Sequence, residues 1–152
     1  MANFLKTIIV RHRKENLKKC SLRGLEEDER LTFFKYPGCI LPDLSHYFLL
    51  SVDGPPLQSD ETRGMMILDG TWRLAEVMEN NLPLPPVRRS LPLLQTAYPR
   101  RQDQVGGLAT VEALFVAYTI LRIPTEGILD NYYWKNDFIQ INDDWFKSKR
   151  VE

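Results

Sequence analysis

Short apolar runs separated by polar turns occupy the first half of the chain. Phe4–Val10, Leu31–Tyr36 and Tyr47–Val52 are rich in β-branched and aromatic residues, a composition that favours strands. Met65–Leu68 is wholly apolar, which is typical of a strand in a sheet covered on both faces. The pattern therefore predicts four strands before residue 70.

Helical patterns lie between and after these strands. The expected helices are Leu17–Leu25, Trp72–Asn80, Leu108–Arg122 and a last one at about Thr125–Tyr133 or beyond, and Val87–Leu94 is a further candidate strand. Strands that alternate with helices predict an α/β fold with a mainly parallel sheet. The Leu-Pro-Leu-Pro-Pro run at Leu82–Pro86 would break a helix, so we expect a seam there between a small N-terminal α/β lobe, residues 1–86, and a C-terminal lobe, residues 87–152.

The predicted helix Leu108–Arg122 differs from the others because apolar side chains surround it. A helix with this pattern is buried on all sides rather than laid on a surface. Glu112 is its only charged residue before Arg122. A buried carboxylate must be ion-paired, hydrogen-bonded or turned toward a pocket, so we expect one of these three environments for Glu112.

The chain has 20 basic and 20 acidic residues, but they are unevenly distributed. Residues 1–24 contain seven Lys and Arg with a single acid, Glu15, and residues 87–101 contain four Arg with no acid. If the fold brings these segments together, they form one face that binds RNA phosphates; the alternative is a scatter of solvated charges. The candidate RNA-binding residues are Arg11, Arg13, Lys18, Lys19, Arg23, Arg88, Arg89, Arg100 and Arg101.

Asp69-Gly70-Thr71-Trp72 follows the wholly apolar strand and precedes a predicted helix. In open α/β sheets ligands bind outside the carboxyl ends of the strands. Asp69 is therefore the candidate catalytic residue, either as a base or as a partner of a cationic sulfonium cofactor, with the flat face of Trp72 beside it. The alternative is a capped helix start, with Asp69 or Thr71 as the N-cap and Trp72 as a core anchor.

Other chemistry-bearing patterns are weaker. Gly106–Thr110 is a glycine-rich entry to the buried helix, where backbone N–H groups can bind a polar ligand, but no phosphate-loop Gly-Lys-Ser/Thr follows. His12, Cys20, Cys39 and His46 match no zinc spacing, so no metal is predicted. Because no long apolar run spans a membrane and the two cysteines form no CxxC pair, we expect a cytoplasmic protein.

Four segments in order resemble the small-subunit ribosomal RNA aminocarboxypropyltransferases, members of the wider DTW superfamily. Lys18–Leu25 is similar to the family's basic-Cys-Thr-Gly-basic-x-Leu segment, and Asp69–Trp72 stands where the family has Asp-Cys-Ser-Trp. Ser90–Ala113 contains stretches similar to Leu-Leu-Pro and Leu-Ser-Cys-Val-Glu-Ala, and Trp134–Asn142 resembles Trp-Gly-x-x-Phe-Leu-x-Leu-Asn. The likeness covers almost the whole chain.

The resemblance implies a SPOUT-type fold with a C-terminal trefoil knot and S-adenosylmethionine as the cofactor. Carried over by position, the cofactor-binding residues are Ser21, Leu68, Asp69, Trp72, Leu91, Gly106, Leu108, Thr110 and Glu112.

The implied activity is transfer of the 3-amino-3-carboxypropyl group of S-adenosylmethionine to N3 of a uridine-type base in small-subunit ribosomal RNA or its precursor. The implied product is 5′-methylthioadenosine, and the implied state is a monomer. Residues 98–103, Gly106–Thr110 and the Asp-Gly-Thr-Trp motif look more like the transfer-RNA branch of the superfamily, so transfer to tRNA is one alternative. RNA methyl transfer and a catalytically silent RNA-binding assembly factor are the others.

Overall fold

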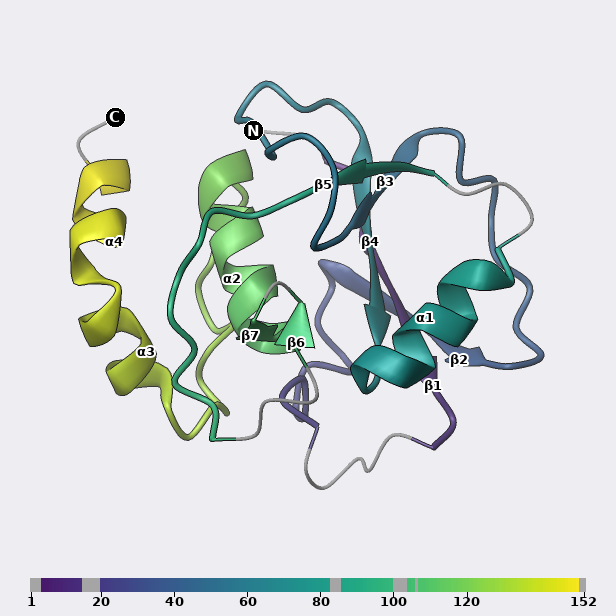
Figure 1. Cartoon of the computed structure of the whole chain (residues 1–152), viewed down its shortest axis with the longest axis horizontal. Helices are drawn as coiled ribbons and strands as arrows, with labels where there is room; N and C mark the ends of the chain where they lie inside the picture. The colour runs from purple at the N-terminus through teal and green to yellow at the C-terminus, as the bar shows by residue number, and fades with distance from the viewer. Residues whose placement is uncertain (1–3, 15–19, 83–85, 100–103, 106, 151–152) are drawn as a thin grey trace.

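A five-stranded parallel sheet forms the centre of the molecule (Figure 1). The computed structural model describes residues 4–14, 20–82, 86–99, 104–105 and 107–150. The strands are β1 (Thr7–His12), β2 (Leu31–Tyr36), β3 (Tyr47–Leu50), β4 (Gly64–Asp69) and β5 (Val87–Arg89). Their order is β2-β1-β4-β3-β5, and each neighbouring pair is parallel. Because β5 pairs with β3, residues on both sides of the Leu82–Pro86 run share one sheet.

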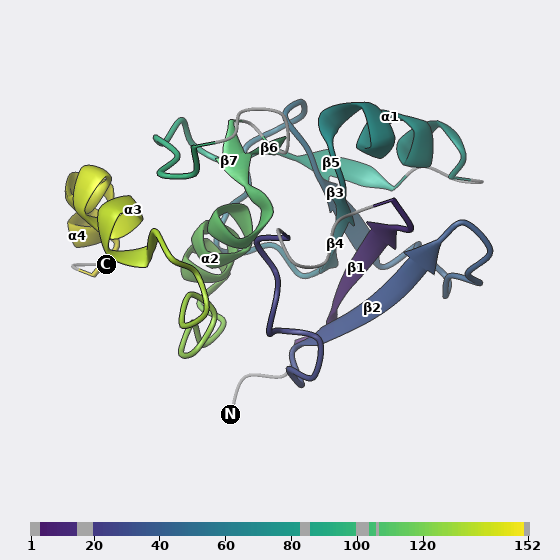
Figure 2. The ribbon, with the colours of Figure 1, turned by 90° about the horizontal axis from the view of Figure 1, so that it is seen from below.

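Alternate residues of the central strands point to opposite faces of the sheet, and each face is covered by a helix (Figure 2). Ile8, Val10 and Met66 pack with Met78 of α1 (Trp72–Asn80) in one core cluster. Ile9 and Ile67 point the other way and join the core cluster that contains α2 (Thr110–Leu121). The central strands are therefore apolar on both faces, as their sequences predict.

Helix α2 is the main element of the larger core. A short antiparallel pair, β6 (Gln104–Val105) and β7 (Leu108–Ala109), leads directly into it. Nine of its 12 residues are buried, and Tyr118 near its end shares a 2.6 Å hydrogen bond with Thr7 of β1. The predicted all-round burial of this helix is confirmed.

The chain ends in two short helices, α3 (Lys135–Ile141) and α4 (Asp143–Arg150), which place Phe138 and Phe146 in the larger core. The segment after β5 passes between α2 and this pair (Figure 1). Within the described part of the chain, no helix is long and apolar enough to cross a membrane.

Two expected helices are wrong, while the four early strands and α1 are confirmed. The described residues of Leu17–Leu25 form turns, in which Arg23 bonds back to Cys20 and Gly24 has a φ of +93°. Thr125–Tyr133 also forms successive turns rather than a helix, with Gly127 at a φ of +83°. In both segments a left-handed glycine interrupts a pattern that otherwise suits a helix. The final helices instead lie beyond Trp134.

Candidate functional site

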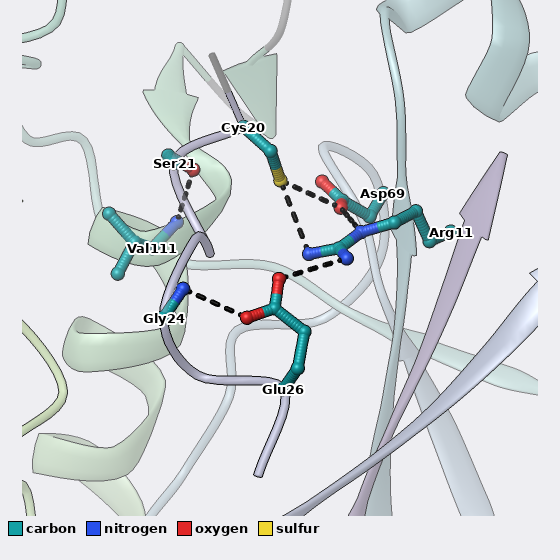
Figure 3. A network of polar contacts seen from close by, with 7 residues as sticks. All are labelled: Arg11, Cys20, Ser21, Gly24, Glu26, Asp69 and Val111. Atoms are coloured by element: carbon teal, nitrogen blue, oxygen red, sulfur yellow. Dashed lines mark hydrogen bonds and ion pairs between the residues drawn. The ribbon is translucent and has the colours of Figure 1, made fainter. Parts of the chain in front are cut away.

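The carboxyl ends of β1 and β4 bring a cation beside the predicted catalytic carboxylate. Arg11 and Asp69 are register partners in the two parallel strands. The Nε of Arg11 donates to Oδ2 of Asp69 at 3.2 Å, and the thiol of Cys20 donates to the same oxygen at 3.2 Å (Figure 3). Asp69 is 2% exposed, so its charge is balanced within the protein rather than by water.

Arg11 also fixes the turn segment 20–26 against the sheet. Its Nη1 donates to Oε2 of Glu26 at 3.1 Å, and Oε1 of Glu26 accepts from the backbone N–H of Gly24 at 2.9 Å (Figure 3). The guanidinium lies 4.7 Å from the ring centroid of Phe33 on the neighbouring strand β2. One cation therefore holds two strand ends and a turn together.

Burial, followed by the nearby negative charge of Asp69, raises the pKa of the Cys20 thiol. Burial opposes the positive charge of Arg11, but Cys20 and Asp69 offset it, and the pKa of Arg11 lies above its ordinary value. Because the thiol stays protonated at neutral pH, Cys20 is a hydrogen-bond donor here and a poor nucleophile.

The start of α2 receives its cap from this same turn segment. Ala109 is the N-cap of α2 and has no side-chain oxygen to offer. The hydroxyl oxygen of Ser21 accepts from the backbone N–H of Val111 at 3.1 Å instead (Figure 3). Ser21 and Thr110 thus lie at a helix N-terminus, where backbone donors and the helix dipole favour polar or anionic ligand groups.

Glu112, the single acid of α2, is held by four hydrogen bonds from uncharged groups within the described part of the chain. Its Oε1 accepts from the Thr96 hydroxyl at 2.6 Å and from the Ala109 N–H at 2.8 Å. Its Oε2 accepts from the Ala97 N–H at 2.9 Å and from the Tyr132 hydroxyl at 2.8 Å. Burial and the Glu112 charge raise the pKa of Tyr132, which therefore remains a donor.

The predicted cofactor residues are distributed over several parts of the structure. Leu68 lines a cleft of about 420 Å³ between α1 and the ends of β3 and β4. Leu91 lines a different cleft, of about 600 Å³, beside the last turn of α2 and α4. Leu108 is buried in the core, Trp72 begins α1, and Gly106 lies outside the described residues. No single described cleft contains all of these residues.

The alternative reading of the Asp-Gly-Thr-Trp motif holds for one residue. The Thr71 hydroxyl oxygen accepts from the Leu74 N–H at 3.3 Å and caps α1. Asp69 is not this cap, because its carboxylate faces Arg11 and Cys20.

Several of the predicted RNA-binding arginines are engaged by acids of the same chain. Besides Arg11, Arg88 is ion-paired with Glu79, and Arg89 is ion-paired with Glu61 at 2.8 Å. Arg13 and Arg23 are exposed. Lys18, Lys19, Arg100 and Arg101 lie outside the described residues, so a common basic face stays a prediction.

The sequence reasoning missed the residues that complete these networks. Glu26, Thr96 and Tyr132 carry no motif signal of their own, and the sequence marks Cys20 only through the rejected zinc spacing and the family resemblance. Among the described residues, no cluster of three or more His, Cys, Asp or Glu could hold a metal ion.

The protein is of the α/β class, with a parallel sheet and a polar network at the carboxyl ends of its central strands. Residues 49–150 match the family described as "Ribosome biogenesis protein, C-terminal", and the chain belongs to this family. The match includes Asp69 and the whole of α2, but not Arg11 or the turn segment 20–26.

Two relatives extend this comparison. The chain is 32% identical over 84 residues to the 16S rRNA aminocarboxypropyltransferase of Methanobrevibacter smithii, covering 54% of this chain and 49% of that protein. It therefore spans about half the length of this curated relative. The fold is similar to the structure of the SAM-dependent rRNA:acp-transferase Tsr3 from Vulcanisaeta distributa, with a TM-score of 0.72, 21% identity and coverage of 97% of this chain and 84% of that chain.

Proposed function

We propose that this protein transfers the 3-amino-3-carboxypropyl group of S-adenosylmethionine to a uridine-type base in small-subunit ribosomal RNA. The observation that carries the proposal is the charged strand-end site, Asp69 with Arg11, beside the N-terminus of α2 in a chain of this family. When bound, S-adenosylmethionine supplies an electrophilic carbon: N3 of the base bonds to it, the carbon–sulfur bond breaks, and its electron pair leaves with 5′-methylthioadenosine.

The residues at the strand ends suit an orienting role for Asp69 better than a role as a mobile base. Its Oδ2 already accepts from Arg11 and Cys20, and the side chain is almost fully buried. A carboxylate fixed in this way can hold a positively charged group or a base N–H in place. The proton of N3 would then pass to solvent or to a group of the RNA.

The cofactor site is proposed to extend from the cleft at Leu68 to the N-terminus of α2. Apolar Leu68 and Ala75 line that cleft, which suits an uncharged ring or methyl group. Ser21 and Thr110 offer hydroxyls beside backbone donors, which suit the amino acid end of the cofactor. Leu91, Gly106, Leu108 and Trp72 complete the proposed set, with a SPOUT-type arrangement and a trefoil knot as its scaffold.

The proposed RNA interface draws on basic residues from both halves of the chain. Arg13 and Arg23 are exposed, and we include Lys18, Lys19, Arg100 and Arg101 in the same proposed interface. Action as a monomer in the cytoplasm belongs to this proposal as well.

Product analysis tests the reaction. Incubation of the protein, S-adenosylmethionine and precursor small-subunit RNA should release 5′-methylthioadenosine and add the mass of the aminocarboxypropyl group to one nucleotide. S-adenosylhomocysteine as the product would instead mean methyl transfer. Tight RNA binding with no cofactor affinity by titration calorimetry would mean a silent assembly factor. Modification of tRNA but not of ribosomal RNA would overturn the proposed substrate.

A further inference from the structure

Glu112 was expected to contact the cofactor, but its surroundings leave no atom for a ligand. The side chain is 0% exposed, and each carboxylate oxygen already accepts two hydrogen bonds. Its four donors come from three separate parts of the chain: Thr96 and Ala97, Ala109, and Tyr132. A buried carboxylate without a cation is costly unless it is fully hydrogen-bonded, so these contacts hold one another in place.

The segment around Thr96 has a second attachment on its other side. The side-chain amide of Asn142, which follows α3, donates to the backbone oxygen of Gln95 at 2.8 Å. Its oxygen accepts from the Gln95 N–H at 2.9 Å, as a paired strand would. Segment 95–97 is therefore held to α2 by Glu112 and to the C-terminal helices by Asn142.

We propose that Glu112 is a positioning residue, which holds segment 95–97 against the start of α2. The inference rests on the proposed function, in which Thr110 at the start of α2 contacts S-adenosylmethionine. Glu112 joins Ala97, downstream of Leu91, directly to Ala109, next to Thr110. Tyr132 binds the same carboxylate from a segment with no proposed cofactor contact.

The chemistry of the four donors makes Glu112→Gln a sharp test. Each carboxylate oxygen accepts one hydroxyl and one backbone N–H. The hydroxyls of Thr96 and Tyr132 can rotate to accept from an amide, but a backbone N–H cannot. Whichever way the Gln amide is turned, Ala97 or Ala109 loses its acceptor.

Thr96→Val and Tyr132→Phe form a matched pair, because each removes one hydroxyl donor from the same carboxylate. S-adenosylmethionine affinity is measured by titration calorimetry well below each melting temperature, together with affinity for a ribosomal RNA fragment. We expect the cofactor dissociation constant to rise at least tenfold in Glu112→Gln and at least fivefold in Thr96→Val. It should stay within twofold of wild type in Tyr132→Phe, although that variant also loses thermal stability. Thr96→Ser, which retains the hydroxyl, should restore wild-type affinity, and RNA affinity should change less than twofold throughout.

Equal cofactor affinity in Thr96→Val and Tyr132→Phe would overturn the inference, because it would reduce Glu112 to a general stabiliser of the core. The same holds for wild-type affinity in Glu112→Gln. Absence of cofactor binding by the wild-type protein would refute the proposed function, and this inference with it. Wild-type turnover combined with unaffected variants would refute the inference alone.

Discussion

The two buried carboxylates near the start of α2 are stabilised in opposite ways. Asp69 lies at the end of a strand and is compensated by a cation, Arg11, and a thiol. Glu112 lies in the first turn of a helix and is compensated by four uncharged donors, aided by the helix dipole. Both are almost inaccessible to water, but of the two only Asp69 has a cation among its described partners.

This difference separates two uses of a buried charge. An ion pair at the carboxyl ends of two parallel strands fixes a charge where ligands bind, and the two charges can be removed together without leaving either unpaired. A carboxylate that accepts from backbone N–H groups of distant segments fixes the course of the chain instead. We therefore interpret Asp69 as serving the reaction and Glu112 as serving the shape of the site.

The largest expected effect separates turnover from affinity. Asp69→Asn retains the shape of the side chain but removes its charge, and we expect the turnover number at saturating cofactor to fall at least 100-fold, equivalent to about 2.7 kcal/mol. Glu112→Gln should instead raise the KM for the cofactor and lower the turnover number much less. Release of 5′-methylthioadenosine measures both. If the two variants lose the same parameter to the same extent, the comparison fails.

A second prediction concerns charge compensation. Asp69→Asn leaves Arg11 buried with less negative charge around it, and Arg11→Met leaves Asp69 without a cation, so each should destabilise the fold. In the double variant neither charge remains unpaired, and we expect a coupling free energy of about 2 kcal/mol from urea unfolding. The matched control combines Arg11→Met with Glu112→Gln, which should be additive because the described partners of Glu112 are all uncharged. Coupling of equal size in the control would contradict the distinction.

The sequence predicts local features of this site well and its long-range contacts poorly. β2 and α1 have the predicted bounds because their patterns are complete within six and nine residues. The lone acid in an apolar helix correctly indicates that Glu112 needs partners. The identity of those partners depends on how the chain returns to α2, and nothing near Thr96 or Tyr132 in the sequence marks them. Arg11 likewise lies in a basic segment and is therefore predicted to bind RNA. Only the register of β1 with β4 places it beside Asp69.

The smallest expected effect is on stability at alkaline pH, where the neighbours of the two carboxylates ionise in different ranges. Burial and Asp69 raise the pKa of Cys20 in the folded protein, whereas in the unfolded chain a thiol has a pKa of about 8.5. The stability that Cys20 contributes is therefore complete below about pH 8.5 and is lost as the pH rises above it, by up to about 1.4 kcal/mol per pH unit. Burial and Glu112 also raise the pKa of Tyr132, but an unfolded tyrosine ionises only near about pH 10.

Urea unfolding between about pH 8.5 and about pH 10 tests this difference. Wild type and Tyr132→Phe should lose stability as the pH rises through this range, whereas Cys20→Ala should not. Cys39→Ala, a cysteine outside the Asp69 network, should behave as wild type. If Cys20→Ala and wild type lose stability in parallel over this range, the Cys20 thiol does not stay protonated as a donor to Asp69. Arg11 alone would then stabilise the Asp69 carboxylate.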